Sequence, residues 1–118
     1  MKIYGVKLLF QFRVVIGRAS SAMRTTEERV IHVKAASAVK ALRRAKQIGG
    51  KSEFNYLNDE GNRVHFEFIG IMDLLHLGIE REKNEVWYEI RDRLKPMERR
   101  QQWIPAETEL TAIKSETS

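Results

Sequence analysis

Three histidines are the side chains best suited to acid–base chemistry or metal binding in this sequence, namely His32, His65 and His76. Imidazole titrates near neutral pH and is a common metal ligand, so each histidine could serve either purpose. His32 and His65 alternate with apolar neighbours, which predicts that both project from one face of a sheet, away from the covering helix. With Glu67, Glu89 and Trp87 on the same face, they could form a small polar site for a ligand or a reaction.

No established catalytic or metal-binding motif accompanies these residues. The sequence has no HExxH zinc motif, no closely spaced histidine pair and no phosphate loop, since Gly49 and Gly50 follow a predicted helix instead of preceding one. It has no cysteine, which excludes disulfides, thiolate metal sites and cysteine nucleophiles. We therefore expect no cofactor and no metal ion, and favour a protein that is not an enzyme. Most surface histidines on a half-exposed sheet have no catalytic role.

A second candidate for function is a concentration of positive charge on one predicted helix. Six Lys or Arg residues and no acid lie between Lys34 and Lys51, whereas the rest of the chain has 15 basic and 16 acidic residues. The outward face of the helix carries Lys40, Arg43, Arg44 and Lys46. Such a cluster attracts nucleic acid, phosphorylated ligands or acidic protein surfaces. The alternative is a solvated face, because Lys and Arg are good helix formers.

The helix that carries these charges is predicted over residues 38–48. Ser37 can accept a hydrogen bond from one of the first free amides, and Gly49 and Gly50 can end the helix in the left-handed conformation. Its other face consists of small or apolar residues, namely Ala38, Ala41, Leu42, Ala45 and Ile48. Because an alanine-rich face can lie close to a sheet, we expect it to pack against large Phe and Leu side chains.

Alternating apolar residues predict the strands that this helix covers. The alternation from Ile3 to Ile16 predicts a long strand with one buried face. Further strands are predicted at 27–35, 53–57, 64–68 and 85–94, with a hairpin at 58–62. Residues 71–77 either continue a strand past a bulge or form one helical turn, and we favour the strand. The predicted fold is α+β, an antiparallel sheet of about five strands with one amphipathic helix on one face, in the order β-β-α-β-β-β.

The length of 118 residues fits one domain. We expect a single domain over residues 1–95 and a C-terminal extension over 96–118, partly ordered to about residue 105 and then flexible, because few large apolar residues follow. The N-terminal run is interrupted by Lys7, Gln11 and Arg13 and lacks a cleavage site, which argues against a signal or membrane helix. With the absence of cysteine, this favours a cytoplasmic protein without membrane contact.

Apolar residues on the predicted outer face of the sheet indicate that something covers it. Leu9, Val15 and Trp87 interrupt the polarity of that face, which predicts a homodimer in which a second chain covers part of the sheet. Trp103 is expected to dock on the domain or on the partner subunit. The arginines around Trp103 also allow a nucleic-acid surface, because cations mixed with an aromatic residue are typical of one.

Three runs of the sequence together resemble a known family. They are YGVKLLFQF from Tyr4, EERVIHVKAASAVKALRRA from Glu27 with the hairpin YLNDEGNRVHFEFIGIMDL, and EVWYEIRD from Glu85. These runs resemble a family of small bacterial proteins catalogued only as a domain of unknown function, over residues 3–94. The resemblance implies a compact bacterial domain, and it transfers no functional residue because its motifs are strand and helix patterns.

Three functions follow from these observations. The first is a non-catalytic interaction domain that binds a protein partner, a class that includes antitoxins and immunity-type inhibitors. The second is a nucleic-acid-binding accessory protein that uses the basic face of the 38–48 helix. The third is a small-ligand binder or enzyme that uses the face of His32 and His65, which requires a concave pocket beside them.

Overall fold

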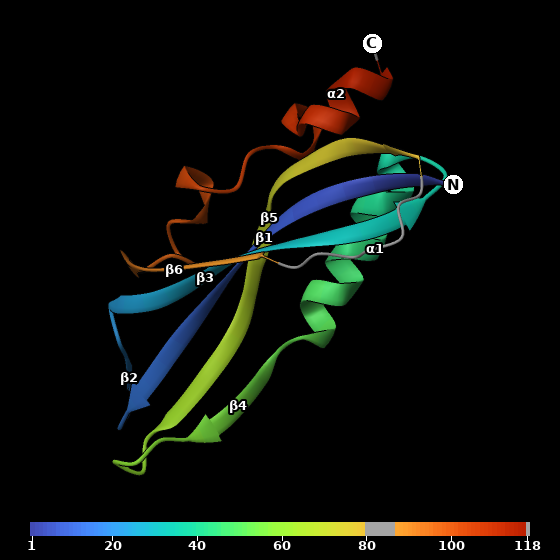
Figure 1. The fold of residues 1–118 in the computed structure, drawn as a ribbon. Coiled ribbons are helices and arrows are strands. Elements are labelled where there is room, and N and C mark those ends of the chain that lie inside the picture. Colours follow the sequence, from blue (N-terminus) through green and yellow to red (C-terminus); the bar gives the residue numbers. More distant parts are fainter. Residues whose placement is uncertain (80–86, 118) are drawn as a thin grey trace.

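The computed structural model describes residues 1–79 and 87–117, with only the backbone described for residues 79 and 87–89. Its centre is a twisted antiparallel sheet (Figure 1). The elements in chain order are β1 (Lys2–Ile16), β2 (Ala19–Ser20), β3 (Met23–Ala35), α1 (Ala38–Lys51), β4 (Phe54–Leu57), β5 (Arg63–Ile79), β6 (Trp87–Leu94), two 3-10 turns (Arg100–Gln102 and Glu107–Glu109) and α2 (Thr111–Thr117). The sheet order is β4-β5-β1-β3-β6, with β2 paired to the end of β1. The α+β class and the antiparallel sheet are confirmed.

Strand β1 lies at the centre of the sheet because both of its edges pair with other strands, and both of its faces are buried over most of its length. Side chains at even positions face α1, and four of them are buried in the core: Tyr4, Val6, Leu8 and Phe10. On one side β1 pairs with β3, from Lys2 opposite Ala35 to Gln11 opposite Thr26. On the other side it pairs with β5 along almost its whole length. A single strand therefore organises both halves of the sheet.

Strand β5 is one continuous strand that contains β-bulges. Its register against β1 shifts at three places, which leaves Ile69, Met72 and Leu77 without a directly paired residue. Each bulge adds to the local twist of the strand. Residues 71–77, which could have been a helical turn, belong to this strand, so the prediction of a strand continued past a bulge is confirmed.

Helix α1 begins where the sequence predicts, but it extends three residues further. The Ser37 hydroxyl accepts a hydrogen bond from the backbone amide of Lys40 at 3.3 Å. The predicted end at Ile48 is wrong, because Gly49 and Gly50 are inside the helix and Ser52 caps it. Gly49 is buried, and it lies against the sheet where a larger residue would strike the ring of Phe68. The glycine serves close packing, not termination.

The prediction of a single helix is wrong, since α2 packs on the same side of the sheet as α1. Leu110 and Ile113 are buried in the core that α1 covers, so residues after 105 are not a free tail. The Tyr4 hydroxyl donates a hydrogen bond to Glu116 Oε2 at 2.6 Å, and the amide of Ala38 donates to Glu116 Oε1 at 2.9 Å. The short apolar run Leu110–Ile113 was too brief to produce a recognisable period.

The segment between β6 and α2 covers the outer face of the sheet. Arg24 on β3 is buried, and its guanidinium binds Glu98 of this segment, with Nη1 to Oε1 at 2.7 Å and Nη2 to Oε2 at 2.9 Å. The backbone amide of Met97 donates to Gln11 Oε1 at 3.2 Å. Further along, Ile104 lies against Gly70, where an added Cβ would be 3.1 Å away. The chain thus crosses the outer face and then reaches the helix side.

Among the described helices, none has the length and apolarity to cross a membrane.

Candidate protein-interaction surface

The structure does not bring the three histidines together. His32 pairs with Gly5 and His65 pairs with Arg13, so the two lie eight positions apart along β1. At about 3.3 Å per residue this is roughly 26 Å. His76 pairs with Tyr4, whose ring centroid is 5.3 Å from the His76 ring. The predicted site shared by His32 and His65 is therefore not formed, because their strand positions are too far apart.

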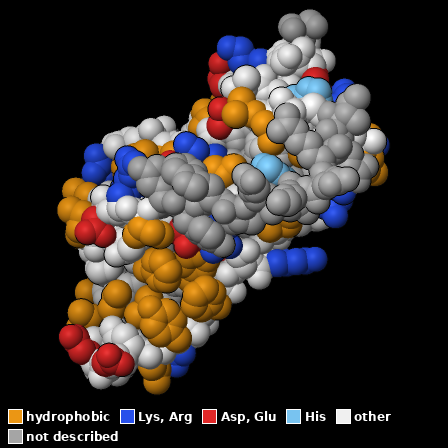
Figure 2. All heavy atoms as spheres, in the orientation of Figure 1, with side chains coloured by type: hydrophobic (Ala, Val, Ile, Leu, Met, Phe, Trp, Pro, Cys, Tyr) orange, Lys and Arg blue, Asp and Glu red, His pale blue; other side chains and the backbone are white. Residues whose placement is uncertain are grey.

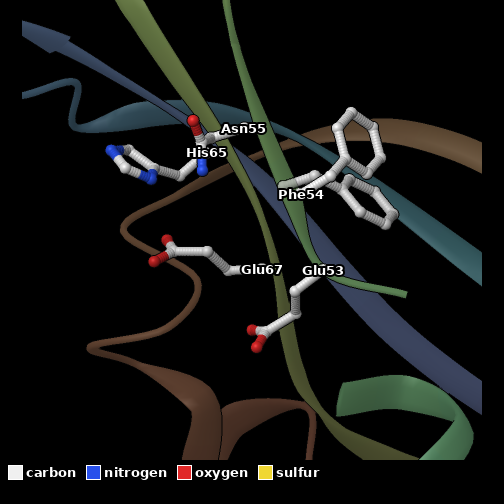
Figure 3. A pocket seen from close by; sticks show the side chains of 6 residues that line it. Glu53, Phe54, Asn55, His65 and Glu67 are labelled. Atoms are coloured by element: carbon white, nitrogen blue, oxygen red, sulfur yellow. The ribbon is translucent and has the colours of Figure 1, made fainter. Parts of the chain in front are cut away.

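His65 and Glu67 line a small pocket of about 200 Å³ at the edge of β4 and β5 (Figure 3). The carboxylate of Glu67 already accepts three hydrogen bonds within the chain. Arg13 donates to it through Nε at 2.8 Å and through Nη2 at 3.0 Å, and Gln11 donates through Nε2 at 2.7 Å. These hydrogen bonds, above all those from Arg13, hold the pKa of Glu67 below its usual range. A carboxylate kept ionised in this way is poorly suited to donate a proton at neutral pH.

The second carboxylate of this pocket is also engaged in the fold. Glu53 Oε2 accepts a hydrogen bond from the backbone amide of Phe68 at 2.9 Å. Across residues 1–79 and 87–117, no group of three or more His, Asp or Glu side chains is arranged to hold a metal ion. The side chains of Trp87 and Glu89, which the sequence placed near the histidines, lie outside the described residues.

All four cations predicted for the outward face of α1 are exposed. Two of them make contacts within the chain: Lys46 Nζ lies 3.0 Å from Glu107 Oε2, and Arg44 Nη1 donates to the Lys34 carbonyl at 3.3 Å. Within the described part of the chain, Lys40 and Arg43 form no ion pair. The structure thus leaves a narrow basic ridge on the helix, on the side away from the sheet.

The residues predicted as a partner interface are not one accessible surface. Leu9 is fully buried, and Ile104 of the chain's own segment after β6 lies against Gly70, the residue that pairs with Leu9. Val15 is half-buried near the far end of β1. Trp103 docks on the domain itself, with the guanidinium carbons of Arg93 and Arg99 at 5.5 and 5.9 Å from its ring centroid. The expectation that a second chain covers Leu9 is therefore corrected: this chain does so.

Among the described residues, a broad apolar surface is exposed on the helix side of the sheet, beyond the C-terminal end of α1. We call it the open face; it consists of Phe12, Val14, Ile16, Met23, Phe54, Tyr56, Ile90 and Leu94. Six of these residues are between 42 and 60% exposed, and Phe12 and Val14 are half-buried. Hydrophobic side chains gather on this half of the molecule, near β4 and the adjoining end of β5 (Figure 2).

Strand register places these side chains on one face across the whole sheet. Phe54 pairs with Phe66, which pairs with Phe12, and Tyr56 pairs with Val64, which pairs with Val14. On the other side of β1, Phe10 pairs with Glu27, which in turn pairs with Ile90. Met23 lies four residues before Glu27 on the same strand, so it faces the same way, and it pairs with Leu94. Because side chains alternate between faces, these positions all point to the helix side. The open face therefore spans β4 to β6.

Aromatic stacking and a shallow hollow shape the open face. Phe54 stacks on Phe66 with ring centroids 4.9 Å apart, and Phe12 contacts Phe66 at 4.7 Å. Beside them lies a hollow of about 370 Å³, lined by Phe12, Val14, Thr25, Tyr56, Asn58 and Val64. A concave, aromatic surface of this kind can receive an apolar side chain from another molecule.

An ion pair marks the boundary between the covered and the open parts of this face. Arg29 Nη2 lies 2.6 Å from Glu27 Oε2, and the guanidinium carbon lies 4.8 Å from the ring centroid of Phe10. The same carbon is 5.8 Å from the centroid of Phe66. A cation above aromatic faces is favourable, and here its charge is balanced by a neighbouring carboxylate.

Sequence reasoning missed the open face, although a length comparison contains the signal. The helix has 14 residues and is roughly 21 Å long at 1.5 Å per residue. Strand β1 has 15 residues, which is roughly 50 Å at 3.3 Å per residue. Its apolar alternation continues to Val14 and Ile16, so a helix of that length cannot cover the whole of that face.

A family model described as "Domain of unknown function (DUF4288)" matches residues 3–87. No curated protein is significantly similar to the chain, and no solved structure is either.

Proposed function

The chain belongs to this family of unknown function, and we propose that it is a non-catalytic interaction domain that binds protein through the open face. The observation that carries the proposal is the six apolar side chains, 42 to 60% exposed, that lie together beyond the end of α1. An exposed apolar patch of this extent costs free energy in water, and on a folded domain it commonly marks a surface that another molecule covers.

The composition of the open face resembles that of protein-binding surfaces. Phe54 and Tyr56 extend from the edge strand β4, are half-exposed and stack close to each other, with ring centroids 6.1 Å apart. Aromatic residues are enriched at the centres of protein interfaces, where each can contribute a large share of the binding energy. The His65 pocket gives less support to a ligand or a reaction, because both of its carboxylates accept hydrogen bonds within the fold.

Two matched double variants test the proposal. The face variant is Met23→Glu/Ile90→Glu, at two open-face positions that are 59 and 57% exposed. The control variant is Val39→Glu/Leu57→Glu, at positions outside the open face that are 50 and 58% exposed. Both add two negative charges at similarly exposed apolar sites, so they differ mainly in location. Circular dichroism and the melting temperature establish that each variant is folded.

Each form is immobilised, and the proteins that it retains from its native cell extract are compared, including untagged copies of the chain itself. The expected result is a protein retained by the wild type and the control variant and lost from the face variant. After purification, that protein should bind the wild type at least tenfold more tightly than the face variant. If all three forms retain the same proteins with equal affinity, the proposal is wrong.

A second candidate function is nucleic-acid binding through α1, and it is favoured by the exposure of Lys40 and Arg43 on the basic ridge. The test is binding of labelled RNA and duplex DNA between about 50 and 300 mM salt, beside Arg43→Ala/Arg44→Ala. A nucleic-acid-binding function predicts affinity that falls steeply with salt, with a slope reduced by about 2 in the variant. Binding that is absent at low salt, or equal in the variant, removes this candidate.

A further inference from the structure

We propose that the partner of the open face is a second copy of this chain, and that two copies associate through this face in a symmetric dimer. This inference rests on the proposed function and names the partner for the same surface. In a two-fold dimer the same patch of each subunit meets its counterpart, so the patch must be complementary to itself. The size, the charge and the shape of the open face meet this requirement.

The exposed area is sufficient for a stable dimer. A large apolar or aromatic side chain has a surface of roughly 200 Å². Six such residues, each about half exposed, offer roughly 600 Å² on one chain. A two-fold pair would therefore bury about 1,200 Å² from these residues alone, and Phe12 and Val14 add to it. This reaches the range of stable protein interfaces, and homodimer interfaces are the more apolar members of that range.

The charges on this side of the sheet do not oppose self-association. Glu27 and Arg29 neutralise each other at 2.6 Å, at the boundary with α1. Asp92 lies on the edge strand β6 and accepts a hydrogen bond from Thr25 Oγ1 at 3.1 Å. Two identical strongly charged surfaces would repel, whereas this face has little net charge. Among the described residues, the basic ridge lies on the outward side of α1, and Arg91 and Arg93 lie on the opposite, outer face of the sheet, where both pair with Glu28.

The shape of the open face suits the packing of two sheets. Its residues come from β1, β3, β4 and β6, so the face is broad in the direction across the strands. Two apolar sheet faces pack about 10 Å apart with interdigitating side chains. The hollow beside Tyr56 would receive a side chain of the facing subunit. The dimer predicted from the sequence used the opposite face, which the chain's own residues 96–104 cover around Leu9.

Sedimentation equilibrium of the purified full chain between about 1 and 100 µM tests the inference. The wild type and the control variant should have twice the 13.8 kDa mass of one chain. The face variant should have the mass of one chain, with a dissociation constant raised at least 100-fold, because four buried glutamates would face one another across the interface. A wild-type monomer at 100 µM overturns the inference, as does a dimer that the face variant and the control variant weaken equally.

Single-cysteine variants locate the interface independently, because the natural chain has no cysteine. Met23→Cys on the open face should react with a maleimide more slowly at 100 µM protein than at 1 µM, as dimerisation covers it. Leu57→Cys, equally exposed but on the outer side of β4, should react at the same rate at both concentrations. Equal protection of both cysteines, or of neither, contradicts a dimer through this face.

Binding of the dye bis-ANS to the wild type separates a failure of this inference from a failure of the proposed function. If the chain is monomeric and the dye binds the wild type and the control variant but not the face variant, the open face is free. The second copy is then not the partner, while the proposed function stands with a different protein. If the monomer binds the dye no better than the face variant does, neither proposal holds.

Discussion

Gly49 lies so close to Phe68 that a Cβ atom on the glycine would be 2.7 Å from two carbons of the ring. At the neighbouring Gly50, no atom outside its chain neighbours and the backbone of α1 lies within 4 Å of the corresponding position. Both glycines are within α1, so alanine has the same intrinsic helical advantage of about 1 kcal/mol at either site. The two positions differ in the space around them.

We expect Gly49→Ala to destabilise the protein by about 1–2 kcal/mol, because the cost of overpacking against Phe68 exceeds the gain in helix propensity. Gly50→Ala should stabilise it by about 0.5–1 kcal/mol. Urea denaturation of both variants measures the two changes. Equal effects at the two positions would mean that the helix does not lie this close to the sheet.

The buried side chain of Leu110 predicts that the C-terminal part of the chain contributes to global stability. Leu110 is 1% exposed in the core beside α1, so Leu110→Ala should lower the free energy of unfolding by about 2–4 kcal/mol. Lys114→Ala is the control, since the pair of Lys114 with Glu109 is 62% exposed on both sides and should contribute less than about 0.5 kcal/mol. If Leu110→Ala changes stability no more than the control, residues after 105 do not form part of the core.

Removing one charge of the ion pair between Arg24 and Glu98 should lower the stability of the protein. Glu98→Gln leaves the guanidinium of Arg24, which is 2% exposed, without its carboxylate. We expect the free energy of unfolding to fall by about 1–2 kcal/mol. This is less than the roughly 3–5 kcal/mol that breaking a fully buried pair costs, because Glu98 itself is half-exposed. Glu107→Gln, at the exposed pair with Lys46, should change stability by less than about 0.5 kcal/mol. Thermal and urea unfolding of the two variants would decide this, and a larger effect at Glu107 would contradict it.

Three glutamates predict that stability falls in acid. Hydrogen bonds hold the pKa of each below its ordinary value of 4.5: from Arg13 for Glu67, from Arg24 for Glu98 and from the Ala38 amide for Glu116. A carboxyl group with a lowered pKa in the folded state contributes stability above its unfolded pKa and loses it as pH falls through the folded value. The urea midpoint should thus be level from pH 7 to about 5 and decline below about 4.5.

The contribution of one glutamate to this decline can be measured separately. Glu98→Gln should flatten the curve below about pH 4.5, since it removes one group that takes up a proton on unfolding. An unchanged slope in this variant would show that Glu98 does not take part in the pH dependence.

The sequence predicted the parts of the fold that local chemistry determines. The N-cap at Ser37, the apolar face around Ala41 and Ala45, and the continuation of β5 through 71–77 all follow from residues near one another in the chain. The end of α1 did not, because Gly49 looks like a helix terminator unless the ring of Phe68 is known to lie against it. Its role depends on a contact with a residue 19 positions away.

The surface predictions failed for a similar reason. Leu9 has the pattern of an apolar residue on an otherwise polar face, and the pattern does not say which segment covers it. Its cover is this chain's own segment, held by polar contacts of Arg24 and Gln11 that have no sequence period. His32 and His65 lie on the same face of the sheet, but the alternation of residues does not tell how far apart they lie along the central strand. The open face required the lengths of α1 and β1 to be compared.

The contact between Tyr4 and Glu116 has a consequence for how the chain acquires its structure. These residues are 112 positions apart, and Tyr4 belongs to the central strand. During synthesis, β1 leaves the ribosome before Leu110 and Ile113, which complete its core side. Non-local pairings of this kind slow folding, and until then the apolar side of β1 is exposed. Nascent chains of this domain should therefore depend on chaperones until Glu116 has left the ribosome.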